Sequence, residues 1–431
     1  MSEIGETVQL RDLAAKVPQS FTDGDWVEAP HIQDSGIRLI QTGNIGLGCF
    51  IDASKKYISQ SSFDALKCKE VYPGDVLICR LAEPIGRSCF APNLGERMIT
   101  SVDVTILRVD TEAFEPRFIV YSLNTPESLR RCEIVSGGTT RQRISRSNLG
   151  RVELSVPERT VQRRIAEILS TLDETIEQTE ALIAKYQQIK AGLMHDLFTR
   201  GVTGDGKLRP ARTEAPQLYK ESPLGWIPKE WEVKPLSDLS QLITSGSRGW
   251  AEYYSDSGPL FLRISNLTRE HINFRWEEVT RVRLPKSSEG QRTAIRPNDI
   301  LISITADLGI IAVAHDDLGE AYVNQHIALV RPRVEPVLSR FIGHCLSTVR
   351  VQKQFLRLND SGAKAGLNLP AVGKILVTKP VDDLEAKRIA TMLDEADQSV
   401  ECYKREAEKL RQQKHGLMHD LLTGRVRVKV A

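Results

Sequence analysis

The amino-acid sequence predicts a mixed α/β protein of two similar halves, each a globular domain followed by one long helix. Two observations predict the long helices: one stretch of sequence occurs twice, and both copies have apolar residues every seven positions. A third observation predicts the globular domains. Short β-branched runs such as Val102–Val109, Ile300–Thr305 and Ala328–Val330 alternate with Gly, Pro and Asp turns, as strands do. Helical runs around Arg117–Leu123 and Ser339–Phe355 make the domains α/β.

The repeat is clearest at Gly192–Leu197 and Gly416–Leu421, which share the hexapeptide GLMHDL. The match extends without a gap, so that 17 of 39 positions from Arg164 to Val202 are identical 224 residues later. A repeat at a fixed offset is typical of a duplicated structural unit.

Each copy of the repeat is expected to form a helix of about 40 residues, roughly 60 Å long at ~1.5 Å per residue. A proline, Pro157 or Pro380, precedes each copy, and Gly201 and Gly424 lie where the helices are expected to end. The apolar spacing predicts a coiled-coil seam, so the two helices are expected to pair; two ordinary amphipathic helices in separate cores are the alternative. The predicted seam residues are Ile165, Leu172, Ile176, Ile183, Lys190, Leu193 and Leu197, and Ile389, Leu393, Val400, Leu410, Lys414, Leu417 and Leu421.

Two lysines, Lys190 and Lys414, interrupt the seam at the same position of the two copies. A polar residue at such a position can fix the register of a coiled coil. A lysine can also extend its charged end into solvent at little cost. We favour the first interpretation as a hypothesis.

The regions upstream of the helices repeat more weakly. Ile40–Ile45 resembles Leu262–Leu267, and Arg117–Ile119 resembles Arg340–Ile342. The offsets drift by a few residues, as small loop insertions would cause. The predicted organisation is a first globular domain at 1–156, a first helix at 157–200, a connector at 201–222, a second globular domain at 223–379, a second helix at 380–424 and a tail at 425–431.

Composition excludes several classes of protein. The 431 residues include 41% hydrophobic residues, enough for two cores, and seven cysteines without a CxxC pair, which favours a reducing cytoplasm. The sequence has neither an apolar signal region, which would predict export, nor a run of 18 apolar residues, which would predict membrane insertion. The net charge of +2 leaves nucleic-acid binding open, because the position of positive charge decides it.

No catalytic or metal-binding signature is present in the sequence. Gly201–Lys207 resembles a phosphate loop, but Leu208 replaces the required Ser or Thr and the segment follows a helix. His415 and His419 have metal-ligand spacing, but the first copy has alanine at the position of His415. No HExxH, adenine-methylating tetrapeptide or nuclease motif occurs. We therefore expect a chain without catalytic, cofactor-binding or metal-binding residues of its own.

These features together resemble the specificity subunit of type I restriction–modification enzymes. The resemblance rests on the twofold plan, on the prolines before each helix and on the closing sequences GLMHDLFTRGV and HGLMHDLLTGRVRV. The segments SGGTTRQRISRSNLGRVELSVP and GWIPKEWEVKPLSDL look like that family's domain end and domain start. The resemblance to this family covers nearly the whole chain and is strongest in the two long helices.

The resemblance implies that this chain and its partner subunits have different functions. Each globular domain would be a target-recognition domain that reads one half of a split double-stranded DNA sequence, and the helices would pack antiparallel as a spacer. Two modification subunits would bring S-adenosylmethionine and the adenine methyltransferase site. Restriction subunits would bring ATP- and Mg-dependent cleavage where they are present. This chain would act in the cytoplasm as the non-catalytic subunit.

The resemblance also implies where DNA binds. A DNA-facing loop is expected at Gly138, Thr139, Thr140, Arg141 and Arg143, with Arg146 beside it; its counterpart, without the arginines, is at Gly362, Ala363 and Lys364. Arginine suits phosphates and guanine edges, although a solvated charged surface is an equal alternative for any one of them. Asn44 and Asn266, at repeated strand ends, either contact bases or cap turns.

Two other functions remain open from the sequence. The first is a scaffold built on a doubled coiled coil without DNA binding, and the second is a fused enzyme with an unfamiliar site. Salt-dependent, sequence-selective duplex binding would argue against the scaffold. Methyl transfer by the isolated chain would support the enzyme.

Overall fold

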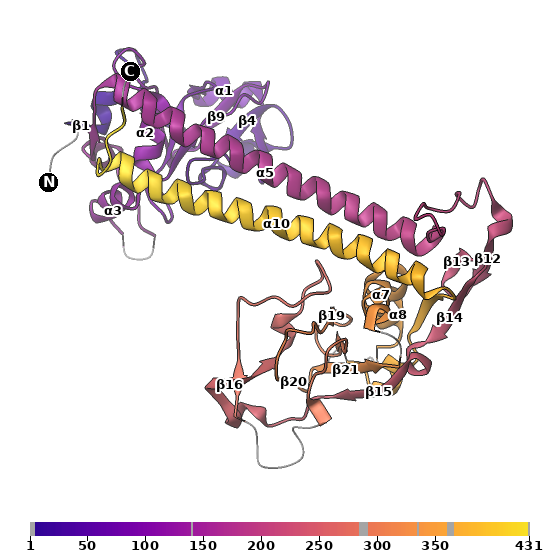
Figure 1. The fold of residues 1–431 in the computed structure, drawn as a ribbon. Coiled ribbons are helices and arrows are strands. Elements are labelled where there is room, and N and C mark those ends of the chain that lie inside the picture. Colours follow the sequence, from indigo (N-terminus) through magenta and orange to yellow (C-terminus); the bar gives the residue numbers. More distant parts are fainter. Residues whose placement is uncertain (1–4, 139–140, 284–291, 334–335, 360–365, 430–431) are drawn as a thin grey trace. The chain divides into compact units, whose positions relative to one another are not determined.

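The computed structural model describes residues 5–138, 141–283, 292–333, 336–359 and 366–429. The chain divides into two compact units, residues 1–180 with 405–431 (unit 1) and residues 181–404 (unit 2). Each unit holds one globular domain and parts of two long helices, α5 (Arg159–Arg200) and α10 (Asp383–Leu422) (Figure 1). The predicted fold class is confirmed. The helices begin and end within three residues of the predicted bounds, but the units divide at the middle of the helices rather than at their starts.

The globular part of unit 1 contains one strand pair and two sheets. The antiparallel pair brings together the start and end of the domain, β1 (Glu6–Gln9) and β11 (Glu153–Val156). The antiparallel sheet has the order β2 (Phe21–Asp23), β10 (Val104–Leu107), β7 (Val76–Cys79) and β8 (Ser88–Phe90). The mixed sheet has the order β3 (Ile32–Gln33), β5 (Lys56–Ile58), β4 (Ile37–Ile40), β9 (Met98–Thr100) and β6 (Glu70–Val71), with β4 and β9 parallel. The α-helices are α1 (Gln60–Leu66), α2 (Pro116–Leu123), α3 (Pro126–Ile134) and α4 (Arg146–Gly150), and the 3-10 helices are η1 (Leu10–Leu13), η2 (Ala29–His31) and η3 (Thr42–Asn44).

Unit 2 repeats this plan. Its antiparallel pair is β14 (Trp231–Pro235) with β22 (Leu376–Pro380), and its antiparallel sheet has the order β15 (Ser240–Ser245), β21 (Ile327–Pro332), β18 (Ile300–Ser303) and β19 (Ile311–Val313). A three-stranded sheet, β17 (Arg281–Val282), β16 (Tyr254–Leu262) and β20 (Ala321–Val323), again contains one parallel pair, β16 with β20. The helices are η5 (Leu236–Leu239), η6 (Trp250–Tyr253), η7 (Ile264–Asn266), α7 (Pro336–Ser347), α8 (Val349–Arg357) and α9 (Leu369–Gly373).

The central strands form where the sequence has uninterrupted apolar residues. VLIC in β7 and VTIL in β10 are buried at all four positions, as are ILIS in β18 and the first four residues of β21. Such strands are covered on both faces, so they show no alternation of polar and apolar residues. The predicted helical run Ser339–Phe355 is two helices, because Thr348 adopts an extended backbone (ψ 147°) between α7 and α8.

The connector predicted at 201–222 has structure of its own. Val202 forms a β-bridge with Leu208, and the connector ends in strand β12 (Tyr219–Ser222) after the 3-10 helix η4 (Pro216–Leu218). Strand β12 pairs with β13 (Gly225–Pro228) in a hairpin.

Each globular core includes the start of one long helix and the end of the other. In unit 1 Ile165 and Leu169 of α5 are buried with Leu421 of α10. In unit 2 Ile389 and Leu393 of α10 are buried with Leu197 of α5. This reciprocal packing makes α5 and α10 run antiparallel within each unit (Figure 1). No helix in the described ranges is long and apolar enough to cross a membrane.

Candidate nucleic-acid interface and helix register

The predicted DNA-facing loop of unit 1 is a closed turn between α3 and α4. Backbone hydrogen bonds join Gly137 and Arg143 in both directions, at 3.0 and 2.9 Å, and Gly138 has a φ of +112°, which favours glycine. Thr139 and Thr140 lie outside the described residues. Arg141, at the far side of the turn, is exposed. The two described ends of the turn are therefore joined by backbone hydrogen bonds.

Three arginines gather at the base of this turn. Arg80 is buried, donates to the Ile144 carbonyl (3.1 Å) and lies 3.2 Å from an Asp23 carboxylate oxygen. Burial lowers the pKa of Arg80; Asp23 opposes this, and the nearby positive charges of Arg143 and Arg146 lower it further. The arginines of the turn and its base outnumber the two acids that pair with them, Asp23 and Asp103, which leaves positive charge for phosphate binding.

Among the residues that the structure describes, an acid holds only one of the predicted arginines. Arg143 Nε lies 2.7 Å from Asp103 Oδ1. The Arg141 and Arg146 side chains are exposed, and neither makes a hydrogen bond or ion pair with another residue that the structure describes. Both are therefore available to an anionic ligand.

Of the two roles that the sequence leaves open for Asn44 and Asn266, the structure shows the turn cap and not the DNA contact. Asn44 and Asn266 are each 1% exposed. Asn44 Oδ1 accepts from the Gln41 amide (2.9 Å), and its Nδ2 donates to the Ile51 carbonyl (2.8 Å). Asn266 does the same with the Arg263 amide (3.0 Å) and the Glu278 carbonyl (2.7 Å). With both ends of each amide used inside the fold, neither side chain can reach a base.

The counterpart residues Gly362, Ala363 and Lys364 lie outside the described residues. The described residue that follows them, Gly366, forms the same kind of β-bridge as Arg143 does in unit 1. Leu81 forms a β-bridge with Arg143 in unit 1, and Thr305 forms one with Gly366 in unit 2. The two loops therefore leave equivalent positions of the repeated fold.

The predicted seam residues lie on the packed faces of the helices. Ile165, Leu197, Ile389, Leu393, Val400, Leu410 and Leu421 are buried, and Leu172, Ile176, Ile183, Lys190, Leu193, Lys414 and Leu417 are half-buried. Tyr186 of α5 stacks on Tyr403 of α10, with ring centroids 5.1 Å apart. The seam predicted by the heptads is the contact face in both units.

The two seam lysines form reciprocal ion pairs across the helices. In unit 1 Lys414 of α10 pairs with Asp173 of α5, and in unit 2 Lys190 of α5 pairs with Asp397 of α10. From Asp173 to Lys190 the chain advances seventeen residues along α5, and from Lys414 to Asp397 it goes back seventeen along α10. Both pairs thus belong to one antiparallel register. The aspartates are themselves repeat equivalents, a match in the sequence that could have identified them.

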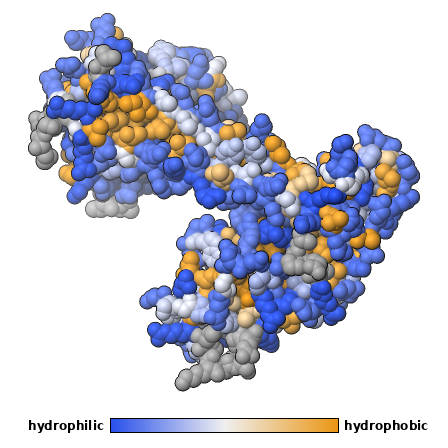
Figure 2. All heavy atoms as spheres, in the orientation of Figure 1, coloured by the Kyte–Doolittle hydropathy of each residue, from blue (hydrophilic) through white to orange (hydrophobic). Residues whose placement is uncertain are grey.

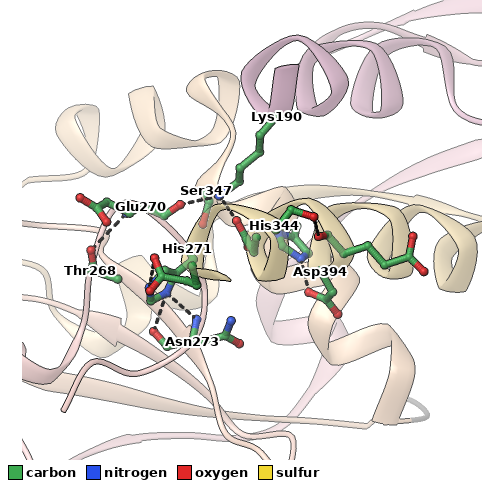
Figure 3. A network of polar contacts seen from close by, with 12 residues as sticks. Lys190, Thr268, Glu270, His271, Asn273, His344, Ser347 and Asp394 are labelled. Atoms are coloured by element: carbon green, nitrogen blue, oxygen red, sulfur yellow. Dashed lines mark hydrogen bonds and ion pairs between the residues drawn. The ribbon is translucent and has the colours of Figure 1, made fainter. Parts of the chain in front are cut away.

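A further side chain from the globular domain bonds to an aspartate of the long helix in each unit, and this side chain differs between the units. In unit 1 Tyr121 donates to Asp173 (2.6 Å). At the equivalent place in unit 2, buried His344 lies 2.7 Å from Asp394, which also accepts from Arg340. Figure 3 shows Lys190 reaching from α5 and the His344 ring beside Asp394.

Unit 2 also brings His344, Asp394 and Asp397 within metal-ligand distance of one another. Arg340 and Lys190 already pair with the two carboxylates. Burial raises the pKa of Asp394, but hydrogen bonds and charge from His344 and Arg340 outweigh it and hold this pKa at about 2. The cluster is an internal ion-pair network, and its cations take the place that a metal would need.

A hollow of about 480 Å³ lies in unit 1 at the end of α10. Met418 and His419 of the GLMHDL sequence line it, opposite Tyr121, Leu129 and the exposed Leu47. Figure 2 shows apolar surface gathered over this end of unit 1. The repeated hexapeptide thus contributes to an accessible, partly apolar surface.

Comparison with known proteins identifies the family. The sequence model of the type I restriction–modification DNA specificity domain matches residues 38–188 and 228–412, more than half of the chain. This chain belongs to that family. As a specificity subunit it serves DNA target recognition and is a non-catalytic component of a restriction–modification complex, which confirms the resemblance read from the sequence.

Individual relatives agree with this assignment. The MjaVIII specificity subunit of Methanocaldococcus jannaschii is 24% identical over 340 residues, which cover 78% of this chain and 76% of the relative. The putative MjaX specificity subunit of the same organism is 25% identical over 370 residues, covering 83% and 79%.

Two solved structures share the fold of this specificity subunit. One is the S subunit of a type I restriction–modification system from M. genitalium, with a TM-score of 0.60 at 17% identity over 96% of this chain and 95% of that one. The other is a chain from a study of complex assembly and conformational transition of the type I system, with a TM-score of 0.54 at 16% identity over 98% of both chains.

Proposed function

We propose that this specificity subunit reads a two-part, asymmetric DNA target, one half with each unit, across a gap set by α5 and α10. The observation that carries the proposal is the duplication. The terminal strand pair and the four-stranded antiparallel sheet occur twice with the same strand order, and the reciprocal pairs Asp173–Lys414 and Lys190–Asp397 have the same helix register in each unit. A duplicated protein with twofold pseudosymmetry suits two half-sites at a fixed spacing.

The proposed asymmetry of the target follows from unlike sequences at equivalent loops of the two units. The turn of unit 1 carries Arg141, Arg143 and Arg146, whereas the equivalent sequence in unit 2 has Gly362, Ala363 and Lys364. Arginine forks bind phosphates and guanine edges, and these differences favour unlike half-sites. The target then need not be a palindrome, as it would be for a homodimer.

We further propose that two modification subunits dock on the long helices at equivalent places. The doubled GLMHDL sequence supports two equivalent partners, and in unit 1 it borders the partly apolar hollow beside Tyr121 and Leu129. The modification subunits would supply S-adenosylmethionine and the methyltransferase site. Restriction subunits, which use ATP and Mg²⁺, would join the complex where the locus encodes them.

The test is methylation-aware sequencing of a naive host that expresses this chain with the modification subunit of its own locus. A new adenine-methylated motif in two unlike parts with a fixed gap is expected. The matched control expresses the modification subunit alone and should give no such motif. Soluble, associated proteins that produce no motif would favour the coiled-coil scaffold without DNA readout.

A further inference from the structure

One turn with a left-handed backbone recurs at the same place in both units. Ala82, just after β7, has a φ of +68°, and Ala306, just after β18, has a φ of +59°. Each is followed by a glycine with positive φ, Gly86 (+89°) and Gly309 (+80°). Glycine adopts this conformation freely, but alanine does so at an energetic cost, and such strain persists where the surroundings enforce it. The two units share these two left-handed positions, which lie four residues apart in unit 1 and three residues apart in unit 2.

The turn lies directly beside the predicted DNA-facing loop. In unit 1 the β-bridge between Leu81 and Arg143 is extended by a hydrogen bond from the Ile144 amide to the Arg80 carbonyl (3.0 Å). In unit 2 a hydrogen bond from the Leu367 amide to the Ile304 carbonyl (2.9 Å) has the same place beside the Thr305–Gly366 bridge. Each turn therefore shares a backbone connection with the loop expected to face DNA.

An arginine holds each turn, but from a different position of the chain. In unit 1 Arg87 Nη1 donates to the Ala82 and Pro84 carbonyls (2.8 and 3.1 Å), while Nη2 donates to the Thr42 carbonyl (2.9 Å). In unit 2 Arg269 donates to the Leu308 carbonyl (2.7 Å) and forms an ion pair with Asp307. In both units an arginine side chain therefore bonds to the backbone of the turn.

The two turns differ in the acid at their exposed tips. Asp307 is neutralised by Arg269. Glu83 is exposed and has no hydrogen bond or ion pair with any residue of the described ranges. It borders a hollow of about 320 Å³ together with Arg130 and Gln142, and Gln142 Oε1 is buried without a hydrogen-bond partner among the described residues. Unit 1 therefore has one exposed acceptor without a partner among the described residues, Glu83, next to its basic turn, whereas Gln142 Oε1 is buried.

An acceptor in this position suits a base and not the DNA backbone. Phosphates repel a carboxylate, whereas the amino groups of cytosine N4 and adenine N6 in the major groove donate to one. The positive charges of Arg141 and Arg146, which have no acidic partner among the described residues, would offset the repulsion from the backbone.

We propose that the turn at residues 81–85 is a second DNA-reading segment of unit 1, in which Glu83 accepts a hydrogen bond from the amino group of one base of the first half-site. This inference rests on the proposed function, because it requires that unit 1 reads DNA. It goes beyond that function by naming the residue and the chemical class of its contact. The alternative is an ordinary solvated carboxylate.

The experiment compares Glu83→Gln with the unchanged chain, each assembled with the modification subunit. The initial methylation rate is measured on duplexes in which one half-site position at a time carries each of the four bases. Glu83→Gln keeps the size of the side chain and removes its charge. Discrimination is expected to fall about tenfold at one position of one half-site, where the preferred base is cytosine or adenine. The other half-site should be read as before.

Glu112→Gln is the matched control. Strand β10 pairs with β7 so that Val104 lies opposite Cys79 and Leu107 opposite Val76. The 81–85 turn follows Cys79, whereas Glu112 follows Leu107, so Glu112 lies beyond the other end of this sheet. Its substitution should leave discrimination unchanged at every position.

A second pair of variants tests the shape of the turn. Ala82→Gly permits the left-handed backbone and should keep the full motif, whereas Ala82→Val disfavours it and should weaken discrimination in the same half-site as Glu83→Gln. Equal discrimination by Glu83→Gln and the unchanged chain at all positions would overturn the inference and leave the proposed function standing. If the unchanged chain directs no methylation, both fail together.

Discussion

At the scale of single residues, the charge of the 137–143 turn is the first property to test. Replacing Arg141 and Arg143 together with alanine is expected to weaken duplex binding, because Arg141 is unpaired among the described residues and Arg143 is held only by Asp103. Each lost phosphate contact lowers the slope of log K against log salt by about 0.9, so the double variant should lower it by up to about 2. Fluorescence anisotropy from about 50 to 200 mM salt measures the slope.

The control for that experiment is Arg164→Ala on α5. Arg164 is exposed and pairs only with Glu167 of the same helix (3.1 Å) among the described residues, so its loss should leave the salt slope unchanged. If the slope of the double variant equals that of Arg164→Ala, the turn does not belong to the DNA interface.

A second residue-scale prediction concerns Glu385, a buried acid in unit 2. It accepts hydrogen bonds from the Val202 amide (2.9 Å), Trp231 Nε1 (3.1 Å) and the Arg209 guanidinium (2.5 and 2.9 Å). Glu385→Ala would leave the largely buried Arg209 with only the exposed Glu230 as an acidic partner among the described residues, and would remove the acceptor of Trp231 Nε1 and the Val202 amide. The free energy of unfolding should therefore fall by about 3 kcal/mol. Urea unfolding followed by tryptophan fluorescence measures this, since Trp231 reports on the site.

Glu395→Ala is the comparison for Glu385. Glu395 is an exposed residue of the same helix, and its substitution should change the free energy of unfolding by no more than about 0.5 kcal/mol. Equal effects of the two substitutions would show that the hydrogen bonds to Glu385 contribute nothing net to stability.

At the scale of elements, the reciprocal pairs make an unequal prediction for two equivalent lysines. Asp397 is 2% exposed, so Lys190→Leu leaves a buried charge unpaired and should lower the free energy of unfolding by about 3 kcal/mol. Asp173 is 41% exposed, so Lys414→Leu should cost no more than about 1 kcal/mol. Thermal melting of the two single variants compares them.

A charge exchange separates pairing from other effects of the substitution. Lys190→Asp combined with Asp397→Lys should recover most of the melting temperature lost in Lys190→Asp alone. If Lys190→Leu melts like the unchanged chain, the lysine extends into solvent and does not fix the register. The outwardly exposed Lys185→Leu is the control on the same helix.

The same elements show what could be predicted from the sequence. Heptads and the repeat identified both helices and their seam, because helix contacts follow a local period that one sequence displays. The roles of Asn44 and Glu385 could not be predicted, since they depend on long-range geometry. Glu385 contacts Trp231 and Val202, which are 154 and 183 residues away in the sequence. For Asn44, the residue type alone is equally compatible with a base contact and with a turn cap.

At the scale of the whole molecule, the proposed function implies that the lengths of α5 and α10 set the number of base pairs between the two half-sites. Inserting seven residues after Glu180 in α5 and seven after Lys404 in α10 keeps the heptad phase and adds ~10 Å of helix. Both half-site sequences should stay the same, and the gap between them should grow by about three base pairs at ~3.4 Å each. Methylation sequencing with the modification subunit measures both quantities at once.

The matched control inserts the same seven residues in α5 alone. Lys190 would then lie two turns away from Asp397 while Asp173 stays opposite Lys414, so the two reciprocal pairs could no longer form in one register. This variant should lose the motif or recover it only with a bulged helix and a lower melting temperature. A double insertion that methylates at the original gap would show that the distance between half-sites is set by contacts outside α5 and α10.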